Sequence, residues 1–78
     1  MTQPPDFAAE AAALCAKLTP RELEVLQLSA KGLSSKVVSK HLGMSRWTAE
    51  QRKQEIFRKL EVTTTIEAAV IAAKAGLV

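Results

Sequence analysis

The chain has 78 residues and a formal net charge of +3, and 47% of its residues are hydrophobic and 24% are charged. This length allows one small domain and leaves no room for a large active-site cleft, while the composition excludes a disordered tail. Aromatic residues make up only 4%, and small aliphatic side chains dominate. Closely packed helices suit such side chains, so we expect an all-α fold.

Residues 1–17 are expected to form an N-terminal extension that is partly helical. Pro4 and Pro5 exclude regular structure at its start. Asp6 is a suitable N-cap for the run FAAEAAALCAKL, which is rich in helix formers. This run is too short to span a bilayer, and no basic segment of a signal peptide precedes it. The one cysteine, Cys15, forms no intramolecular disulfide, which fits a protein of the reducing cytoplasm.

Residues 18–78 are expected to form a domain of four helices. Start and stop signals place these helices at about residues 19–32, 34–43, 45–61 and 64–76. The clearest start is Thr19, because Pro20 fits the first helical position and Glu22 completes a capping box. The second helix is short, and either Ser34 or Ser35 caps it.

The second and third of these helices, joined by the tight turn GMS, have the layout of a helix-turn-helix unit. Val37, Val38 and Leu42 are expected to face the core, and Gly43 allows the turn. The third helix would offer its polar outward face to the major groove of DNA. The expected base-reading residues are Arg46, Trp47, Glu50, Gln51 and Gln54. Trp47 either contacts DNA or a partner, or covers the apolar seam between the two helices.

Positive charge is concentrated in this part of the chain. Residues 31–59 contain eight basic and two acidic side chains, a net charge of +6, so the remainder has a net charge of −3. Such concentration predicts an acidic partner surface, double-stranded DNA first, rather than a merely solvated face. The expected contacts to the phosphate backbone are Lys36, Lys40, Lys53, Arg58 and Lys59.

Several stretches of the chain follow one family pattern. They are LTPRELEVLQLSAKGLSSKVVSKHLGMS, Thr48, IFRKL at residues 56–60, Val62, and the ending EA…GLV. From Leu18 to Val78 the chain therefore resembles the LuxR/GerE-type DNA-binding domain of bacterial transcription regulators. The resemblance implies a four-helix domain with its third helix in the major groove and its fourth in dimer contacts.

The chain departs from this family pattern in the third helix. Glu50, Arg52 and Glu55 stand where the family most often has lysine or glutamate, histidine and asparagine. A glutamate at position 50 can accept a hydrogen bond from a cytosine amino group. Glu55 adds negative charge close to phosphates, which Arg52 and Lys53 offset. Further departures are Val37 in place of glutamate, Ala49 in place of valine and Thr65 in place of arginine.

The fourth helix has two apolar sides. One side is expected to close the core, and it consists of Ile66, Ala69, Val70, Ala73 and Leu77. The other side would stay in water in a monomer, and it consists of Ala68, Ile71, Ala72 and Ala75. Because small residues let two helix backbones approach closely, we expect this second side to form the interface of a weak homodimer.

No constellation for catalysis is present in the sequence. His41 is the one histidine, and it has neither a nucleophile nor a metal-ligating partner at a suitable spacing. We therefore expect no enzyme activity, no cofactor and no metal, and no membrane partner. The sequence favours a sequence-specific DNA-binding transcription regulator that acts as a homodimer. The alternative is a protein-interaction module of the same fold that binds another regulator, with Trp47 as its anchor.

Overall fold

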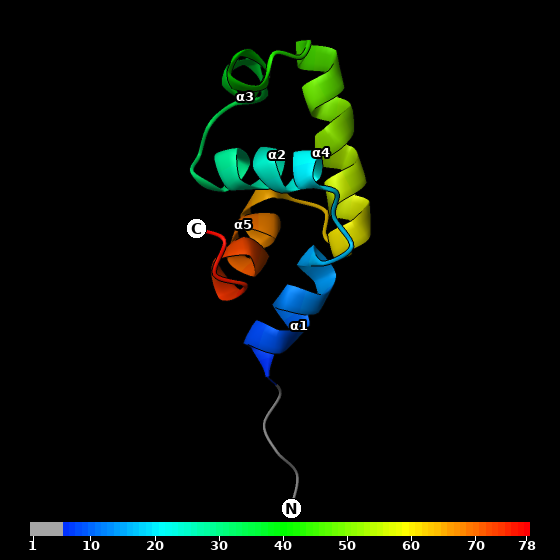
Figure 1. Cartoon of the computed structure of the whole chain (residues 1–78), viewed down its shortest axis with the longest axis vertical. Helices are drawn as coiled ribbons and strands as arrows, with labels where there is room; N and C mark the ends of the chain where they lie inside the picture. Colours follow the sequence, from blue (N-terminus) through cyan, green and yellow to red (C-terminus); the bar gives the residue numbers. More distant parts are fainter. Residues whose placement is uncertain (1–5) are drawn as a thin grey trace, which may run out of the picture.

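The computed structural model of the chain describes residues 6–78, so the expectation for Pro4 and Pro5 lies outside the described residues. Within residues 6–78 the fold is all-α, as expected, with five helices and no strand. The helices are α1 (Phe7–Cys15), α2 (Pro20–Ala30), α3 (Ser35–Leu42), α4 (Arg46–Leu60) and α5 (Thr65–Lys74). In Figure 1, α3 and the start of α4 lie at one end of the molecule, and α1 lies toward the other.

Every helix begins at a side-chain cap. A side-chain oxygen of the residue before the helix accepts a hydrogen bond from the backbone N–H three positions later, which satisfies one of the free N–H groups of the first turn. The five caps are Asp6, Thr19, Ser34, Ser45 and Thr64. The capping box at Thr19 is confirmed, because the carboxylate of Glu22 also accepts from the backbone N–H of Thr19 at 2.9 Å.

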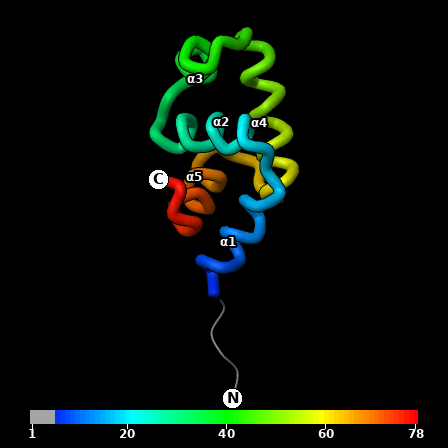
Figure 2. Tube along the Cα trace, viewed as in Figure 1, coloured from blue at the N-terminus to red at the C-terminus, as the bar shows by residue number. Residues whose placement is uncertain are grey.

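The core lies where α5 packs against α2 and α1, and where α4 packs against α2. Figure 2 shows the trace returning from the end of α4 to α5, which lies between α1 and α2. The most deeply buried large side chains of this core include Val25 of α2 and Ile56 and Leu60 of α4. Ile56 and Leu60, in the C-terminal half of α4, lie in this core, whereas α3 lies beside the start of α4 (Figure 1).

Helix α1 is an integral part of the core. Ala11 and Cys15 are buried, and Leu18 is buried just beyond the turn in which its N–H donates to the carbonyl of Cys15. The helix ends at Cys15, earlier than the run of helix formers indicated. Phe7 lies outside the core with 56% of its surface exposed, and the ammonium of Lys74 lies 4.7 Å from the centre of its ring.

The expectation for the two sides of α5 needs correction at four residues, whereas Leu77 packs against the core as expected. Ala68 and Ala72, which were assigned to a free dimer face, are 1% and 0% exposed and lie in the core. Ile66 and Val70, which were assigned to the core, are 78% and 46% exposed. Both sides of this helix are apolar, so periodicity could not choose between them. The small side allows α1 and α2 to pack closely against α5, and for this reason it faces inward.

Candidate nucleic-acid interface

Helices α3 and α4 form a helix-turn-helix unit at the end of the molecule opposite α1 (Figure 1). Gly43 ends α3 with φ of +65°, a left-handed conformation that glycine adopts without strain. The turn is closed by a hydrogen bond of 3.0 Å from the N–H of Met44 to the carbonyl of Ser39. Val38 of α3 and Ala49 of α4 are fully buried, so the two helices meet over a small apolar contact.

The inward set expected for α3 needs one correction. Val38 is buried and Leu42 is half-buried, but Val37 is 37% exposed. Val38 and Leu42 share one face of the helix, but at about 100° per residue Val37 lies roughly 100° from Val38 and about 140° from Leu42 around the helix axis. Val37 therefore lies beside the exposed Lys36 on the outer side of α3.

One exposed row follows the outward face of α4. Trp47, Gln51 and Gln54 are exposed, and they lie on the side opposite to the buried Ala49. Trp47 is 72% exposed, so it does not cover the apolar seam between α3 and α4. We call Trp47, Gln51 and Gln54 the reading row.

Two arginines flank the reading row. With a turn of about 100° per residue, Arg46 lies roughly 80° from Gln54 and Arg52 about 100° from Gln51 around the axis of α4, and both arginines are exposed. Glu50 is half-buried beside the row. On the flank of Arg52, an open groove of about 580 Å³ runs along α4 to the start of α2. Its lining consists of Thr19, Glu22, Trp47, Thr48, Gln51, Arg52, Glu55 and Lys59.

Three lysines lie on or beside α3. Lys36 and Lys40 are exposed on α3. Lys53 is half-buried on α4, and its ammonium lies 3.3 Å from the hydroxyl of the buried Ser35. None of these three lysines forms an ion pair among the described residues. The same is true of Arg46 and Arg52 within the described range.

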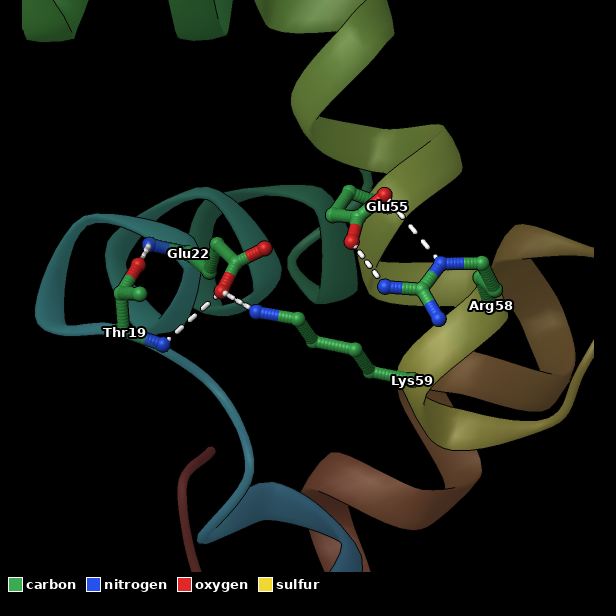
Figure 3. Close-up of polar contacts among 5 residues, drawn as sticks. All are labelled: Thr19, Glu22, Glu55, Arg58 and Lys59. Atoms are coloured by element: carbon green, nitrogen blue, oxygen red, sulfur yellow. Dashed lines mark hydrogen bonds and ion pairs between the residues drawn. The ribbon is translucent and has the colours of Figure 1, made fainter.

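Lys59 has a different role from the one expected for it. Its ammonium lies 2.7 Å from a carboxylate oxygen of Glu22, and the two side chains are 22% and 3% exposed (Figure 3). The pair joins the end of α4 to the first turn of α2. Lys59 is therefore occupied inside the fold, and the expectation of a phosphate contact at this residue is not supported by its position.

Burial raises the pKa of Glu22, but hydrogen bonds from Lys59 and Thr19 and the charge of Lys59 outweigh burial and hold this pKa below its ordinary value. Glu22 thus stays ionised in the protein. The sequence identified Glu22 as a capping residue only. Its second role depends on Lys59, which is 37 positions away in the chain.

Arg58 is also paired. Its guanidinium binds the carboxylate of Glu55 one turn earlier on α4 (Figure 3). The hydrogen bond from Arg58 and the charge of Arg58 lower the pKa of Glu55. The same hydrogen bond and the charge of Glu55 raise the pKa of Arg58. Both side chains are exposed, so Arg58 can exchange this partner for another anion. The negative charge that Glu55 brings to α4 is balanced locally.

The described residues offer little for other chemistry. Among residues 6–78, no group of three or more His, Cys, Asp or Glu side chains is placed to hold a metal ion. In the same range, no helix is both long and apolar enough to cross a membrane. His41 is exposed on α3. Burial raises the pKa of the Cys15 thiol, which makes this cysteine a weak nucleophile.

Comparison with known proteins agrees with this arrangement. The family model GerE, described as bacterial regulatory proteins of the luxR family, matches residues 16–72. The transcriptional regulatory protein YdfI of Bacillus subtilis is 39% identical over 61 residues, which are 78% of this chain and 29% of YdfI. The uncharacterized response regulatory protein YgeK of Escherichia coli is also 39% identical over 61 residues, which are 42% of YgeK.

The nitrate/nitrite response regulator protein NarL of Escherichia coli is 33% identical over 54 residues, which are 69% of this chain and 25% of NarL. The chain thus spans less than half the length of these curated relatives. It belongs to the luxR family of bacterial regulatory proteins. It is a DNA-binding domain of the transcription-regulator type, and this family consists of regulators rather than enzymes.

Proposed function

We propose that the chain is a sequence-specific DNA-binding transcription regulator that acts as a homodimer, with α4 in the major groove. The observation that carries this proposal is the reading row. Three exposed side chains that can contact base edges follow one face of α4, while the opposite face is held against α3 and the core. A single α-helix fits the width of the major groove.

Phosphate contacts would come from the cations that surround the reading row. Lys36 and Lys40 lie on α3, Lys53 faces α3, and Arg46 and Arg52 flank the row on α4. Arg46 was expected among the base-reading residues, and we propose it for a phosphate contact because it lies beside the row and not in it. All five lack an acidic partner within residues 6–78, so binding a phosphate breaks no ion pair. Arg58 can contribute only by giving up Glu55. Phosphate contacts fix the position of the helix, and base contacts supply the choice of sequence.

The dimer interface is proposed on the outer side of α5. Ile66 and Val70 are 78% and 46% exposed, and Ala73 lies on the same side. A second copy packed there about a two-fold axis would remove this apolar stripe from water. Ile71 and Ala75 are half-buried, so they can contribute only at the edge. Two copies would place their recognition helices in half-sites about one helical turn of DNA apart, roughly 34 Å.

The dependence of DNA affinity on salt tests the phosphate contacts. Each phosphate contact contributes about −0.9 to the slope of log K against log salt. Five cations per protomer therefore predict a slope of roughly −4 to −5 for one protomer. Lys40→Ala should reduce this magnitude by about one, whereas Lys17→Ala, a matched control after α1, should leave it unchanged. Equal slopes for the two variants would contradict the proposed docking.

Sedimentation tests the dimer. Ile66→Glu places a carboxylate on the proposed interface, and it should reduce the fraction of complexes with two protomers bound to one duplex. Ala13→Glu, which adds the same single negative charge at an exposed position of α1, serves as the control. Full two-protomer binding by Ile66→Glu would remove α5 as the dimer helix.

A second candidate function remains open because Trp47 is so exposed. Tryptophan is a frequent hot spot of protein interfaces, so α4 could bind another protein. Salt separates the two functions: DNA binding through several phosphates weakens steeply as salt rises, whereas binding centred on Trp47 persists. Failure to bind any duplex at low salt would favour the protein partner.

A further inference from the structure

The three side chains of the reading row share one chemical limitation. Gln51 and Gln54 each present a neutral amide, with one acceptor oxygen and one donor NH₂ group. Trp47 presents an indole, which has a single N–H donor and a large apolar surface. The row therefore has no positive charge. Both glutamines are exposed on α4 and donate no hydrogen bond to another described residue, so their amides are free to meet a ligand.

The donor and acceptor of one glutamine amide match adenine. In the major groove, adenine offers the acceptor N7 beside the donor N6–H₂, so an amide can make two hydrogen bonds at once. Guanine offers two acceptors, N7 and O6, and would leave the amide oxygen facing an acceptor. An unpaired polar atom in a closed interface has a large cost. Gln51 and Gln54 are therefore suited to adenine and unsuited to guanine.

The indole of Trp47 matches thymine. The C5-methyl group of thymine is the one apolar group that the four bases present in the major groove. Trp47 is 72% exposed and leads the row at the first turn of α4. Packing its ring on a thymine methyl would remove apolar surface of both from water.

Groups that would read guanine lie off the row. Arginine and lysine make the commonest specific contacts to guanine. Arg46 and Arg52 lie about 80° and 100° around the helix from the nearest residue of the row, so in a groove that holds α4 they would face its walls. Arg58 shares the outward direction but lies one turn beyond Gln54 and is bound to Glu55. Glu50, half-buried beside the row, suits a cytosine amino group at the edge of the site.

The spacing of the row sets the length of the sequence that it reads. Gln51 and Gln54 are about 4.5 Å apart along the helix axis, and Trp47 and Gln54 about 10 Å apart. Base pairs are spaced about 3.4 Å apart, so the row covers about three base-pair steps. We propose that the core of each half-site is a run of A·T pairs, with adenines bound by Gln51 and Gln54 and a thymine methyl bound by Trp47. This inference rests on the proposed insertion of α4 in the major groove.

The test begins with selection from random duplexes by the full 78-residue chain. The expected result is enrichment of a core of A·T pairs. Gln51→Ala, Gln54→Ala and Trp47→Ala should each relax the preference at their own position, whereas Lys17→Ala should keep the whole preference. All of these side chains are exposed, so melting temperatures close to that of the parent chain will establish that the variants are folded.

Modified bases then test each contact separately. Replacing the paired adenine by 7-deazaadenine removes N7 and should weaken binding roughly fivefold to 150-fold. The same replacement should add little to the loss already caused by Gln51→Ala or Gln54→Ala at the matching position. Replacing thymine by uracil removes the methyl group and should weaken binding about fourfold. Trp47→Ala should be insensitive to that replacement.

The possible outcomes separate this inference from the function on which it rests. Enrichment of a G·C core, or full affinity for both modified duplexes, would overturn the A·T inference and leave DNA binding intact. Enrichment of no duplex at all would overturn the proposed function, and the inference with it. If an A·T core is enriched but the losses of affinity caused by each variant and by its modified base simply add, the assignment of these residues as the ones that contact the core would be overturned.

Discussion

The buried ion pair between Lys59 and Glu22 predicts a large effect of one substitution on stability. Lys59→Met keeps most of the volume of the side chain and removes the ammonium that lies 2.7 Å from Glu22. The carboxylate of Glu22, whose side chain is 3% exposed, then remains buried without its cation. Breaking a buried pair in this way costs about 3–5 kcal/mol.

We expect the lower end of this range, about 3 kcal/mol, because Glu22 keeps the hydrogen bond of 2.9 Å from the N–H of Thr19. Small domains have free energies of unfolding of about 5–15 kcal/mol, so the loss is a large fraction of the total. At about 4–8 °C per kcal/mol for a domain of this size, the melting temperature should fall by roughly 12–24 °C.

The assay is thermal and urea unfolding followed by circular dichroism. Arg58→Met is the matched control, since it removes the cation of the neighbouring pair with Glu55, in which both side chains are exposed. It should change the melting temperature little. The double variant Lys59→Met with Glu22→Gln should recover part of the loss, because neither partner then carries a buried charge. Equal melting temperatures for Lys59→Met and Arg58→Met would refute the structural role of Lys59.

Three further predictions concern single residues. The pKa of Glu22 is lowered in the fold, so its contribution to stability is present above its ordinary pKa of 4.5 and is lost as the pH falls through the lower folded value. In acid, the free energy of unfolding of Glu22→Gln should therefore fall less steeply with pH than that of the parent chain. Equal slopes for the two chains would count against this role of Glu22. Cys15 is buried with a raised pKa, so a thiol reagent at pH 8 should label the native chain far more slowly than the chain in urea. Equal labelling rates would show that α1 is not packed against α5 in solution. Trp47→Ala should leave the melting temperature unchanged, and in the parent chain the fluorescence of Trp47 should change when a duplex binds. A large loss of stability in Trp47→Ala would show that this side chain packs inside the fold instead.

Local signals in the sequence predicted the helix starts. The caps at Thr19, Ser45 and Thr64 are confirmed by their hydrogen bonds in the structure. They could be predicted because each cap depends on residues within one turn of the chain. Either Ser34 or Ser35 could cap α3, and the structure selects Ser34, whose hydroxyl accepts from the backbone N–H of Val37. The choice between two neighbouring serines depends on the direction from which the chain enters the helix, and the sequence alone does not show that direction.

Contacts between distant segments were not predictable in the same way. Lys59 was counted among surface cations because the sequence gives no sign that it meets Glu22. The inward side of α5 was misassigned because both of its sides are apolar, and only the packing of α1 and α2 against Ala68 and Ala72 distinguishes them. The exposure of Trp47 was likewise left open by its position at the start of α4, and the structure decides it.

The central claim, that α4 reads DNA through its outward face, is tested most directly by nuclear magnetic resonance of the chain bound to a selected duplex. We expect the largest shifts at the side-chain amides of Gln51 and Gln54 and at the indole N–H of Trp47, with smaller shifts on α3. The side-chain amide of Gln27, which donates to the carbonyl of Leu77 inside the fold, is an internal reference that should not move. Large shifts confined to α1 and α2, with the reading row unchanged, would show that α4 does not read DNA through its outward face.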